Sequence, residues 1–376
     1  MSHAVNATNL HVGGGVQVAV SFLHELAAHP EQARHISVFA STKVDAELKS
    51  IGCDVRHFKR YAVMDVRGAW QGARALHQEL NRFGTVFTVF GPLYRWRPPF
   101  RSIVGFAQPW IIYPDNECMD QLQTRARWQQ KAKLWLQKQY FRQSDELIVE
   151  LEHVREGVIR ELGVDKVNVH VVHNCISSVY HDPSAWQEVK VPSASGDIKL
   201  GFLGRNYLHK NTRIFPAIAR ILRQKHGIDA KFLVTFDDLE WEACGPEFKS
   251  SCVNCGPLRV SQCPAFYQAL DGVVFPSLLE CASATPLEAM AMEKPLFASD
   301  RPFNRDLCGN HAHYFDPMSP ESAAAAIAKV FAAGGPDRSA LRAARKHALA
   351  FSTPGDRAQQ YLKLLTQTTA HPHLRR

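Results

Sequence analysis

Two glutamates, Glu280 and Glu288, are the residues of this chain whose type and spacing most clearly suggest chemistry. Seven residues lie between them in the run Phe-Pro-Ser-Leu-Leu-Glu-Cys-Ala-Ser-Ala-Thr-Pro-Leu-Glu-Ala-Met-Ala, which starts at Phe275. Ionised carboxylates only accept hydrogen bonds, and hydroxyl groups donate them. Two acids that flank one loop can therefore bind the hydroxyls of a sugar or a ribose.

The elements around this loop favour a phosphate as well. Residues 272–275 form a short apolar run, which predicts a buried strand, and Thr285 and Pro286 suit the N-cap and first position of a helix. Open α/β sheets bind ligands at the carboxyl ends of their strands, and a helix N-terminus offers N–H groups to an anion. We therefore expect Ser283, Ala284 and Thr285 to face a phosphorylated sugar.

This segment resembles the Glu-x7-Glu signature of retaining glycosyltransferases with the GT-B fold, in particular glycosyltransferase family 4. The spacing, the preceding Pro-Ser and the final Glu-Ala-Met-Ala all agree with that signature. The resemblance implies that Glu288 holds the ribose hydroxyls of a nucleotide-sugar donor and that Glu280 faces its hexose. The simpler alternative is a surface loop with two solvated acids.

Arg205 and Lys210 follow the first strand expected in the second half of the chain, in Phe-Leu-Gly-Arg-Asn-Tyr-Leu-His-Lys-Asn. This run resembles the family's strand-Gly-Arg loop with a later Lys, whose cations bind the donor diphosphate. A planar guanidinium and a compact ammonium suit phosphate oxygens, and they can stabilise the charge that develops on the leaving group. The resemblance gives both residues a catalytic role; the alternative is a basic surface loop.

Two segments of the first half supply further candidates. Gly14 and Gly15 belong to a glycine-rich turn after the first expected strand, where the backbone can approach a ligand closely. The run is not a dinucleotide fingerprint, because Val18 stands where the third glycine is required. The family uses such a loop to face the donor. Gln108 stands where many relatives carry a His near the transferred sugar, so it could contact the sugar or acceptor, or only cap a strand.

The sequence favours chemistry without a metal. It contains no Asp-x-Asp, the motif that holds a metal in the other major glycosyltransferase fold. Cys244, Cys252, Cys255 and Cys263 could hold a structural zinc, but zinc ribbons usually pair two Cys-x2-Cys knuckles and only one is present. Nine cysteines in a chain of this length fit reduced thiols better than a disulfide framework.

Positive charge is concentrated in the first half. Residues 56–142 contain 15 Lys and Arg and 5 Asp and Glu, an excess of +10 against +8 for the whole chain. The helix expected over residues 123–142 mixes basic and aromatic side chains, which suits an anionic membrane surface or, equally, a helix packed by its apolar side. No apolar run is long enough to span a membrane, and the start of the chain does not resemble a signal peptide.

The order of expected elements agrees with the motif. Short apolar strands alternate with helices in both halves, and a polar stretch over residues 177–195 separates them. We predict an α/β protein of the GT-B type, with two Rossmann-like domains facing a central cleft. An acceptor-side domain covers residues 1–178, a nucleotide-sugar domain covers 196–350, and a C-terminal helix within 354–376 crosses back to the first domain.

The expected function is the retaining transfer of a hexosyl unit from a nucleotide-diphosphate sugar to a glycan or lipid-linked glycan. By resemblance to bacterial surface-polysaccharide mannosyl and rhamnosyl transferases, we expect GDP-mannose or a GDP-deoxyhexose as donor. The expected location is the cytoplasm, with peripheral contact to the inner face of the membrane. One alternative is a nucleotide-sugar epimerase of the same fold. Another is a non-enzymatic protein that binds anionic surfaces, although no nucleic-acid motif is present.

Overall fold

The computed structural model describes residues 2–68, 72–192 and 196–367 and divides the chain into two compact units. The first unit contains Met1–Pro114, Leu122–Asn174 and the segment from Pro354 onward, and the second contains Asp115–Gln121 and Cys175–Thr353. Parts of the expected linker (193–195) and of the C-terminal segment (368–376) lie outside the described residues.

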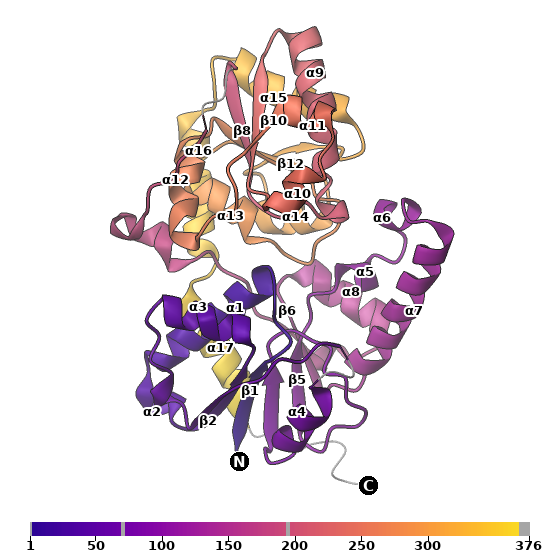
Figure 1. Cartoon of the computed structure of the whole chain (residues 1–376), viewed down its shortest axis with the longest axis vertical. Coiled ribbons are helices and arrows are strands. Elements are labelled where there is room, and N and C mark those ends of the chain that lie inside the picture. Colours follow the sequence, from indigo (N-terminus) through magenta and orange to yellow (C-terminus); the bar gives the residue numbers. More distant parts are fainter. Residues whose placement is uncertain (1, 69–71, 193–195, 368–376) are drawn as a thin grey trace. The chain divides into compact units, whose positions relative to one another are not determined.

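The first unit is built on a seven-stranded sheet in which every pairing is parallel (Figure 1). The strand order is β3-β2-β1-β4-β5-β6-β7, so the chain reverses direction across the sheet between β1 and β4. The strands are β1 His3–Ala7, β2 Ile36–Ala40, β3 Arg60–Val63, β4 Thr85–Thr88, β5 Arg101–Gly105, β6 Glu146–Val149 and β7 Val169–Val171.

Helices cover both faces of this sheet, which explains why its central strands are buried along their whole length (Figure 1). The helices are α1 Gly14–Ala27, α2 Pro30–Ala33, α3 Thr42–Ser50, α4 Ala73–Leu80, α5 Pro109–Ile112, α7 Thr124–Phe141, α8 Glu152–Leu162 and α17 Pro354–Thr366. The strand β3 was not expected. It lies at the sheet edge with exposed and partly exposed side chains, so it lacks the apolar run that identifies a buried strand.

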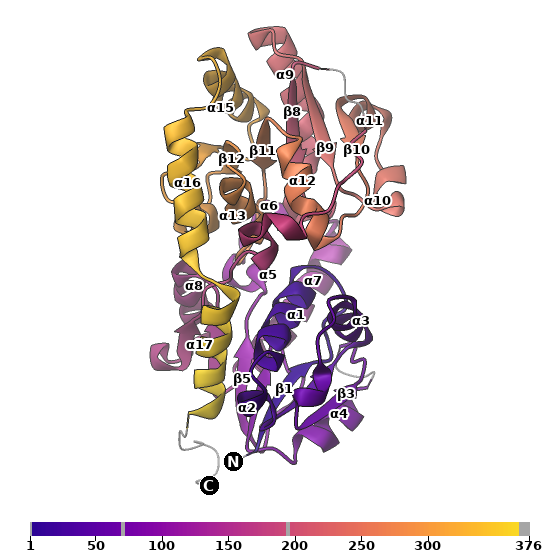
Figure 2. The ribbon, with the colours of Figure 1, turned by 90° about the vertical axis from the view of Figure 1, so that its left-hand side faces the viewer.

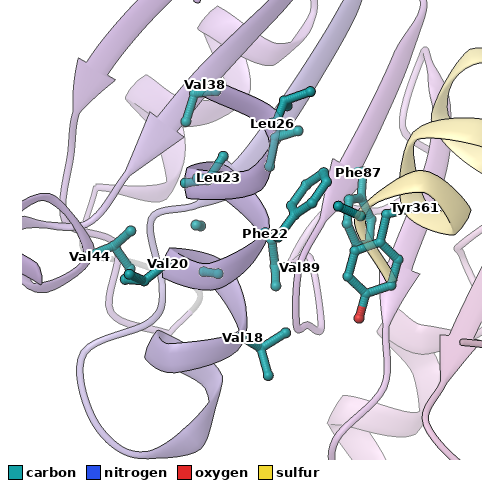
Figure 3. Close-up of a cluster of buried hydrophobic side chains, with 14 of the residues drawn as sticks. Val18, Val20, Phe22, Leu23, Leu26, Val38, Val44, Phe87, Val89 and Tyr361 are labelled. Atoms are coloured by element: carbon teal, nitrogen blue, oxygen red, sulfur yellow. The ribbon is translucent and has the colours of Figure 1, made fainter. Parts of the chain in front are cut away.

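The C-terminal helix α17 belongs to the first unit, as predicted (Figure 2). The ring of Tyr361 lies 5.2 Å from that of Phe22 on α1 and 4.9 Å from that of Phe87 on β4 (Figure 3). The buried Arg101 side chain donates from Nη1 to the carbonyls of Leu364 and Gln367, each at 2.9 Å. Aromatic packing and a buried guanidinium therefore fix this helix to the sheet.

The second unit has a six-stranded sheet, also parallel at every pairing, with the order β10-β9-β8-β11-β12-β13. The chain reverses direction between β8 and β11, which is where such sheets bind ligands. The strands are β8 Ile198–Phe202, β9 Ala230–Val234, β10 Cys252–Asn254, β11 Gly272–Phe275, β12 Leu296–Ser299 and β13 His313–Phe315.

The helices of the second unit include a short one from the first half of the chain. They are α6 Glu117–Asp120, α9 Phe215–His226, α10 Asp238–Glu242, α11 Pro246–Ser251, α12 Cys263–Gln268, α13 Ala284–Ala291, α14 Pro302–Cys308, α15 Pro320–Ala332 and α16 Arg338–Phe351. The edge strands β10 and β13 were not expected, because each has three residues and partly exposed side chains. The two parallel sheets with their helices form an α/β fold of the GT-B type, as predicted.

Two segments lie in a different unit from the one their sequence suggested. Residues 115–121 were assigned to the first domain but pack with the second unit. The polar stretch after Ser177 was interpreted as a linker, but its beginning also packs there: Tyr180 is buried, and the Trp186 indole donates to the Val179 carbonyl at 2.7 Å. A single buried aromatic in a polar stretch gives no periodic pattern, so the sequence did not reveal this packing.

Candidate functional site

Glu280 and Lys210 meet in the second unit at the carboxyl ends of two neighbouring strands. Glu280 lies in the loop between β11 and α13, and Lys210 closes the short 3-10 turn Leu208–Lys210 that follows β8. The Lys210 Nζ donates to Glu280 Oε1 at 2.6 Å, and both side chains are largely buried. The structure therefore pairs a predicted cation with a predicted acid, 70 positions apart, at the point where the strand order reverses.

Backbone contacts explain why this pair forms. The Leu278 N–H donates to the His209 carbonyl at 2.7 Å, which ties the β11 loop to the β8 loop. Asn211 has a φ of 55°, the left-handed conformation that Asn tolerates, and its buried side chain donates to the Pro317 carbonyl at 2.8 Å. Burial lowers the pKa of the adjacent His209. Lys210 therefore stands on a turn that is held at both sides.

Arg205 lies on the same loop but is already engaged by two acids. Its Nε donates to Glu240 Oε1 at 2.8 Å, and its Nη2 donates to Asp237 Oδ2 at 2.5 Å. Hydrogen bonding to Glu240 raises the pKa of Arg205 above its ordinary value. These contacts use two of its three nitrogens and leave Nη1 as the atom for a further partner. The two acids had not been identified from the sequence.

Glu288 lies further along its helix than predicted. The helix α13 starts at Ala284 with Ser283 as its N-cap, so the prediction of Thr285 as N-cap and Pro286 as first residue was wrong. Ser283 caps the helix with extended backbone and no side-chain hydrogen bond, while the Thr285 hydroxyl donates to the Leu203 carbonyl at 3.4 Å. Glu288 therefore lies in the second turn of the helix rather than at its start.

Two buried tyrosines surround Glu288. The Tyr267 hydroxyl on α12 donates to Glu288 Oε2 at 2.9 Å, and the Tyr180 hydroxyl lies near the same carboxylate. Burial raises the pKa of Glu288 to about 7, although both phenols act in the opposite direction. Neither tyrosine was singled out in the sequence, because an isolated Tyr carries no motif. We call Tyr180, Cys263, Tyr267 and Glu288 the Glu288 pocket.

A segment from the first half of the chain packs close to Glu280. Cys118 and Met119 on α6 are buried within the second unit, and the α6 residue Glu117 forms an ion pair with Arg301. Burial raises the pKa of the Cys118 thiol to about 11, and Glu280 is among the charged groups that act on it. The surroundings of Glu280 therefore include residues that are more than 150 positions away in sequence.

Three predicted site residues, Gly14, Gly15 and Gln108, belong to the first unit. Gly14 and Gly15 form the first turn of α1, and Gly13 before them has a φ of 73°, which favours glycine. A Cβ at Gly15 would lie 3.3 Å from Leu10 and Phe90 side chains, whereas one at Gly14 would meet no atom within 4 Å. Gln108 Nε2 donates to the buried Gln137 Oε1 at 3.1 Å. Gln108 is thus held by a neighbouring side chain.

The four cysteines considered for zinc do not form a metal site. Within residues 2–68, 72–192 and 196–367, no group of three or more His, Cys, Asp or Glu side chains could hold a metal ion. Cys263 lies in the Glu288 pocket, while Cys244 donates to the Glu240 carbonyl at 3.2 Å on another helix. Cys252 has Cys244 nearby, but the four cysteines do not gather into one ligand set.

The basic helix α7 leaves large aromatic side chains exposed. Trp128 and Trp135 are 68% and 63% exposed, whereas Leu134, Gln137 and Phe141 on the same helix are buried. Packing against the unit therefore does not account for all of its apolar surface. None of the helices in the described parts of the chain is long and apolar enough to cross a membrane.

Comparison with solved structures supports the assignment of the fold. Sucrose-phosphate synthase from Thermosynechococcus elongatus is similar with a TM-score of 0.70 and 14% identity, over 97% of this chain and 98% of that one. A glycosyltransferase from Rickettsia africae gives 0.67 and 13%, over 97% of both chains. Anabaena HepE in complex with UDP and glucose gives 0.66 and 12%, over 97% and 99%. Identities this low establish the GT-B fold alone.

Comparison of sequences adds the class of protein. Residues 197–333 match the family model described as glycosyl transferases group 1. The matched segment contains Arg205, Lys210, Glu280 and Glu288, and runs from just before β8 to just after α15. No curated protein matches the chain. The domain match, taken with the fold, indicates a glycosyltransferase of the GT-B type.

Proposed function

We propose that this protein is a retaining hexosyltransferase that takes its sugar from a nucleoside-diphosphate donor. The observation that carries the proposal is the Lys210–Glu280 pair, 2.6 Å apart at the carboxyl ends of β8 and β11. A cation suits the diphosphate and an acid suits the hydroxyls of the hexose, so the pair matches the junction between the two parts of such a donor.

In this proposal, the diphosphate binds to Lys210 and Arg205. Transfer breaks the bond between the sugar C1 and a phosphate oxygen, so negative charge develops on the leaving group. Lys210 Nζ keeps two hydrogens beyond the one given to Glu280, and Arg205 keeps Nη1. Backbone N–H groups at the start of α13, around Ser283, Ala284 and Thr285, add an oriented dipole.

Retention follows from the face of C1 on which the acceptor bonds. The acceptor hydroxyl forms the new bond to C1 on the face that the phosphate leaves, and its proton passes to an oxygen of the departing diphosphate. No protein nucleophile and no metal is needed in this scheme. Glu280 orients the hexose, and Glu288 accepts the ribose hydroxyls. Gly14 and Gly15 stay predicted donor contacts, and Gln108 a predicted sugar or acceptor contact.

The donor and acceptor are proposed at a finer level. A GDP-activated mannose or deoxyhexose is our first candidate, by resemblance to surface-polysaccharide enzymes. The Anabaena HepE complexes, solved with UDP-glucose among other ligands, make UDP-glucose the first competitor to test. The basic residues and exposed tryptophans of α7 support a lipid-linked glycan at an anionic membrane as the acceptor's setting.

The decisive experiment is binding followed by turnover. Thermal-shift measurements with UDP, GDP and their sugars should show one nucleotide family raising the melting temperature, because a ligand of the native state stabilises it. NMR of the product formed from the preferred donor should show the donor's anomeric configuration. A protein that binds none of these nucleotides contradicts the proposal.

Two control reactions separate the alternatives. Incubation with donor alone should return the donor unchanged, whereas an epimer would identify a nucleotide-sugar epimerase.

Flotation with anionic liposomes at low salt tests the membrane setting. If the protein binds neither anionic nor neutral vesicles, the proposed contact through α7 is wrong, while the transferase proposal is unaffected.

A further inference from the structure

The Glu288 pocket contains groups that the proposed function does not use. Glu288 Oε2 accepts a hydrogen bond from Tyr267, whose side chain is fully buried, at 2.9 Å. Tyr180 is 3% exposed, and its ring lies 6.3 Å from that of Tyr267. Its hydroxyl forms no hydrogen bond of good geometry within the described structure, although Glu288 and Cys263 are its polar neighbours.

This arrangement matters because an ionised carboxylate has no hydrogen to donate and accepts at both oxygens. A ribose diol that binds to it must therefore donate both of its hydroxyl hydrogens. A protonated Glu288 would present one O–H donor and lose acceptor capacity. Burial disfavours the charged form, and each phenol hydrogen bond favours it. The balance between burial and the two phenols therefore decides whether Glu288 can accept a ribose at neutral pH.

The other elements packed against α13 do not contribute a competing charge. The strands β11 and β12 are buried and carry no charged residue. On α14, whose charged residues are Arg305 and Asp306, the Arg305 guanidinium is paired with Asp300 at 2.7 Å. On α16, the Arg345 guanidinium donates to Glu293 at 3.1 Å, and the His347 ring is hydrogen-bonded to the Leu307 carbonyl at 2.9 Å. The groups that face Glu288 are thus Tyr267 and Cys263 from α12 and Tyr180 from the 3-10 turn Ser178–His181.

We propose that Tyr267 is a positioning residue for the nucleotide, since its hydroxyl holds the Glu288 carboxylate as an acceptor for the ribose. We infer that the buried Tyr180 hydroxyl, which lies near the same carboxylate without a formed hydrogen bond, becomes its second donor when the nucleotide binds. The inference rests on the proposed function, because it assumes that a ribose binds at Glu288. It adds a specific role for two phenols that no motif identifies.

The test is equilibrium binding of UDP and GDP, measured by calorimetry from pH 5.5 to 8.5. For the wild type, affinity should rise with pH and level off above about pH 7, because Glu288 loses its proton over this range. The nucleotide's own phosphate titrates near pH 6, roughly, in every variant. Glu288→Gln retains that phosphate contribution alone, so the difference between the two profiles reports Glu288.

Tyr267→Phe should weaken binding at pH 7 by about tenfold or more, as expected for a hydrogen bond to a charged group, and move the midpoint to higher pH. Tyr267→Phe combined with Tyr180→Phe should move it further. Tyr314→Phe is the matched control, because it removes a hydroxyl that donates to the Gly309 carbonyl elsewhere in the same unit. Its profile should coincide with that of the wild type.

The outcomes separate the two proposals. If the wild type binds nucleotide but Tyr267→Phe binds with the same affinity and midpoint, the positioning role is wrong and the proposed function stands. A lower melting temperature with an unchanged midpoint would indicate a merely structural tyrosine and also overturn the inference. A double variant identical to Tyr267→Phe overturns the part concerning Tyr180. If the wild type binds neither nucleotide, both proposals fail.

Discussion

The two acids of the Glu-x7-Glu motif lie in contrasting surroundings. Glu280 lies in a loop beside a cation, with Lys210 Nζ at 2.6 Å. Glu288 lies on a helix beside two phenols, and burial raises its pKa to about 7. One acid is paired with an opposite charge, and the other depends on neutral hydrogen-bond donors.

This difference suggests a division of labour within one short segment. A carboxylate paired with a cation, such as Glu280, can orient both that cation and a sugar hydroxyl. A half-buried acid beside two phenols, such as Glu288, can change its protonation near neutral pH, because desolvation makes its charged form costly. Seven intervening residues thus separate an acid that is paired with a cation, Glu280, from an acid whose charge depends on pH, Glu288.

The largest expected effect comes from removing the cation. Lys210→Ala should lower kcat by about 100- to 1000-fold, because the leaving diphosphate loses a charge that stabilises it in the transition state. Steady-state rates with saturating donor measure this. Lys225→Ala, an exposed lysine on α9 of the same unit, is the control and should match the wild type. Unchanged turnover in Lys210→Ala would refute its assigned role.

A smaller loss of activity is expected from neutralising Glu280, the partner of Lys210. Glu280→Gln preserves the side-chain volume but removes a charge-assisted acceptor for Lys210 and for the hexose, so kcat/KM should fall by about 10- to 100-fold. Comparing kcat/KM for the intact donor with the affinity for the bare nucleotide locates the defect. Weakening of nucleotide affinity by the same factor would show that Glu280 does not act on the sugar.

Glu288→Gln should have its clearest effect on stability, and that effect should depend on pH. Because folding raises this pKa from 4.5 to about 7, the folded state is progressively penalised as pH rises through that window, by at most about 3 kcal/mol. The variant cannot ionise and escapes the penalty. Its melting temperature relative to the wild type should therefore increase between pH 4.5 and 7, measured without ligand. A constant difference across that range would show that folding does not raise the pKa of Glu288.

The smallest effect is expected from chelation. If Lys210 and Arg205 supply the charge at the Glu280 side, EDTA should change the rate by less than about twofold, because no Lewis acid is required there. Rates before and after chelation, with and without added Mg²⁺ or Mn²⁺, provide the measurement. Loss of activity that either metal restores would show that the Lys210–Glu280 side needs a further cation.

Local sequence patterns predicted the architecture well where strands are central and apolar. The motif strand of residues 272–275 was placed at the observed bounds, and the C-terminal helix expected within 354–376 is observed as Pro354–Thr366. The edge strands β3, β10 and β13 were not predicted, because a strand paired on one side only can carry polar side chains and then lacks an apolar run. The start of α13 was predicted two residues too late, because Thr285 and Pro286 also suit an N-cap and a first helical position.

The residues that perform chemistry were visible in the sequence wherever they belong to a contiguous motif. Arg205, Lys210, Glu280 and Glu288 were identified because a strand end followed by a charged loop has a recognisable order along the chain. That information is local, since the types and spacing of neighbouring residues determine strand, turn and helix. The sequence by itself therefore determined which groups are present and at which end of a sheet they emerge.

The tertiary structure alone decided which groups meet. It placed Lys210 on Glu280, occupied two nitrogens of Arg205 with Asp237 and Glu240, and enclosed Glu288 between Tyr267 and Tyr180. It also kept the four cysteines that their spacing had suggested as a zinc site from gathering into one ligand set. Such contacts depend on strand order and burial across 20 to more than 100 residues, and a protonation state depends on the completed surroundings. The spacing of residues within a motif therefore predicts neither the tertiary contacts nor the protonation state.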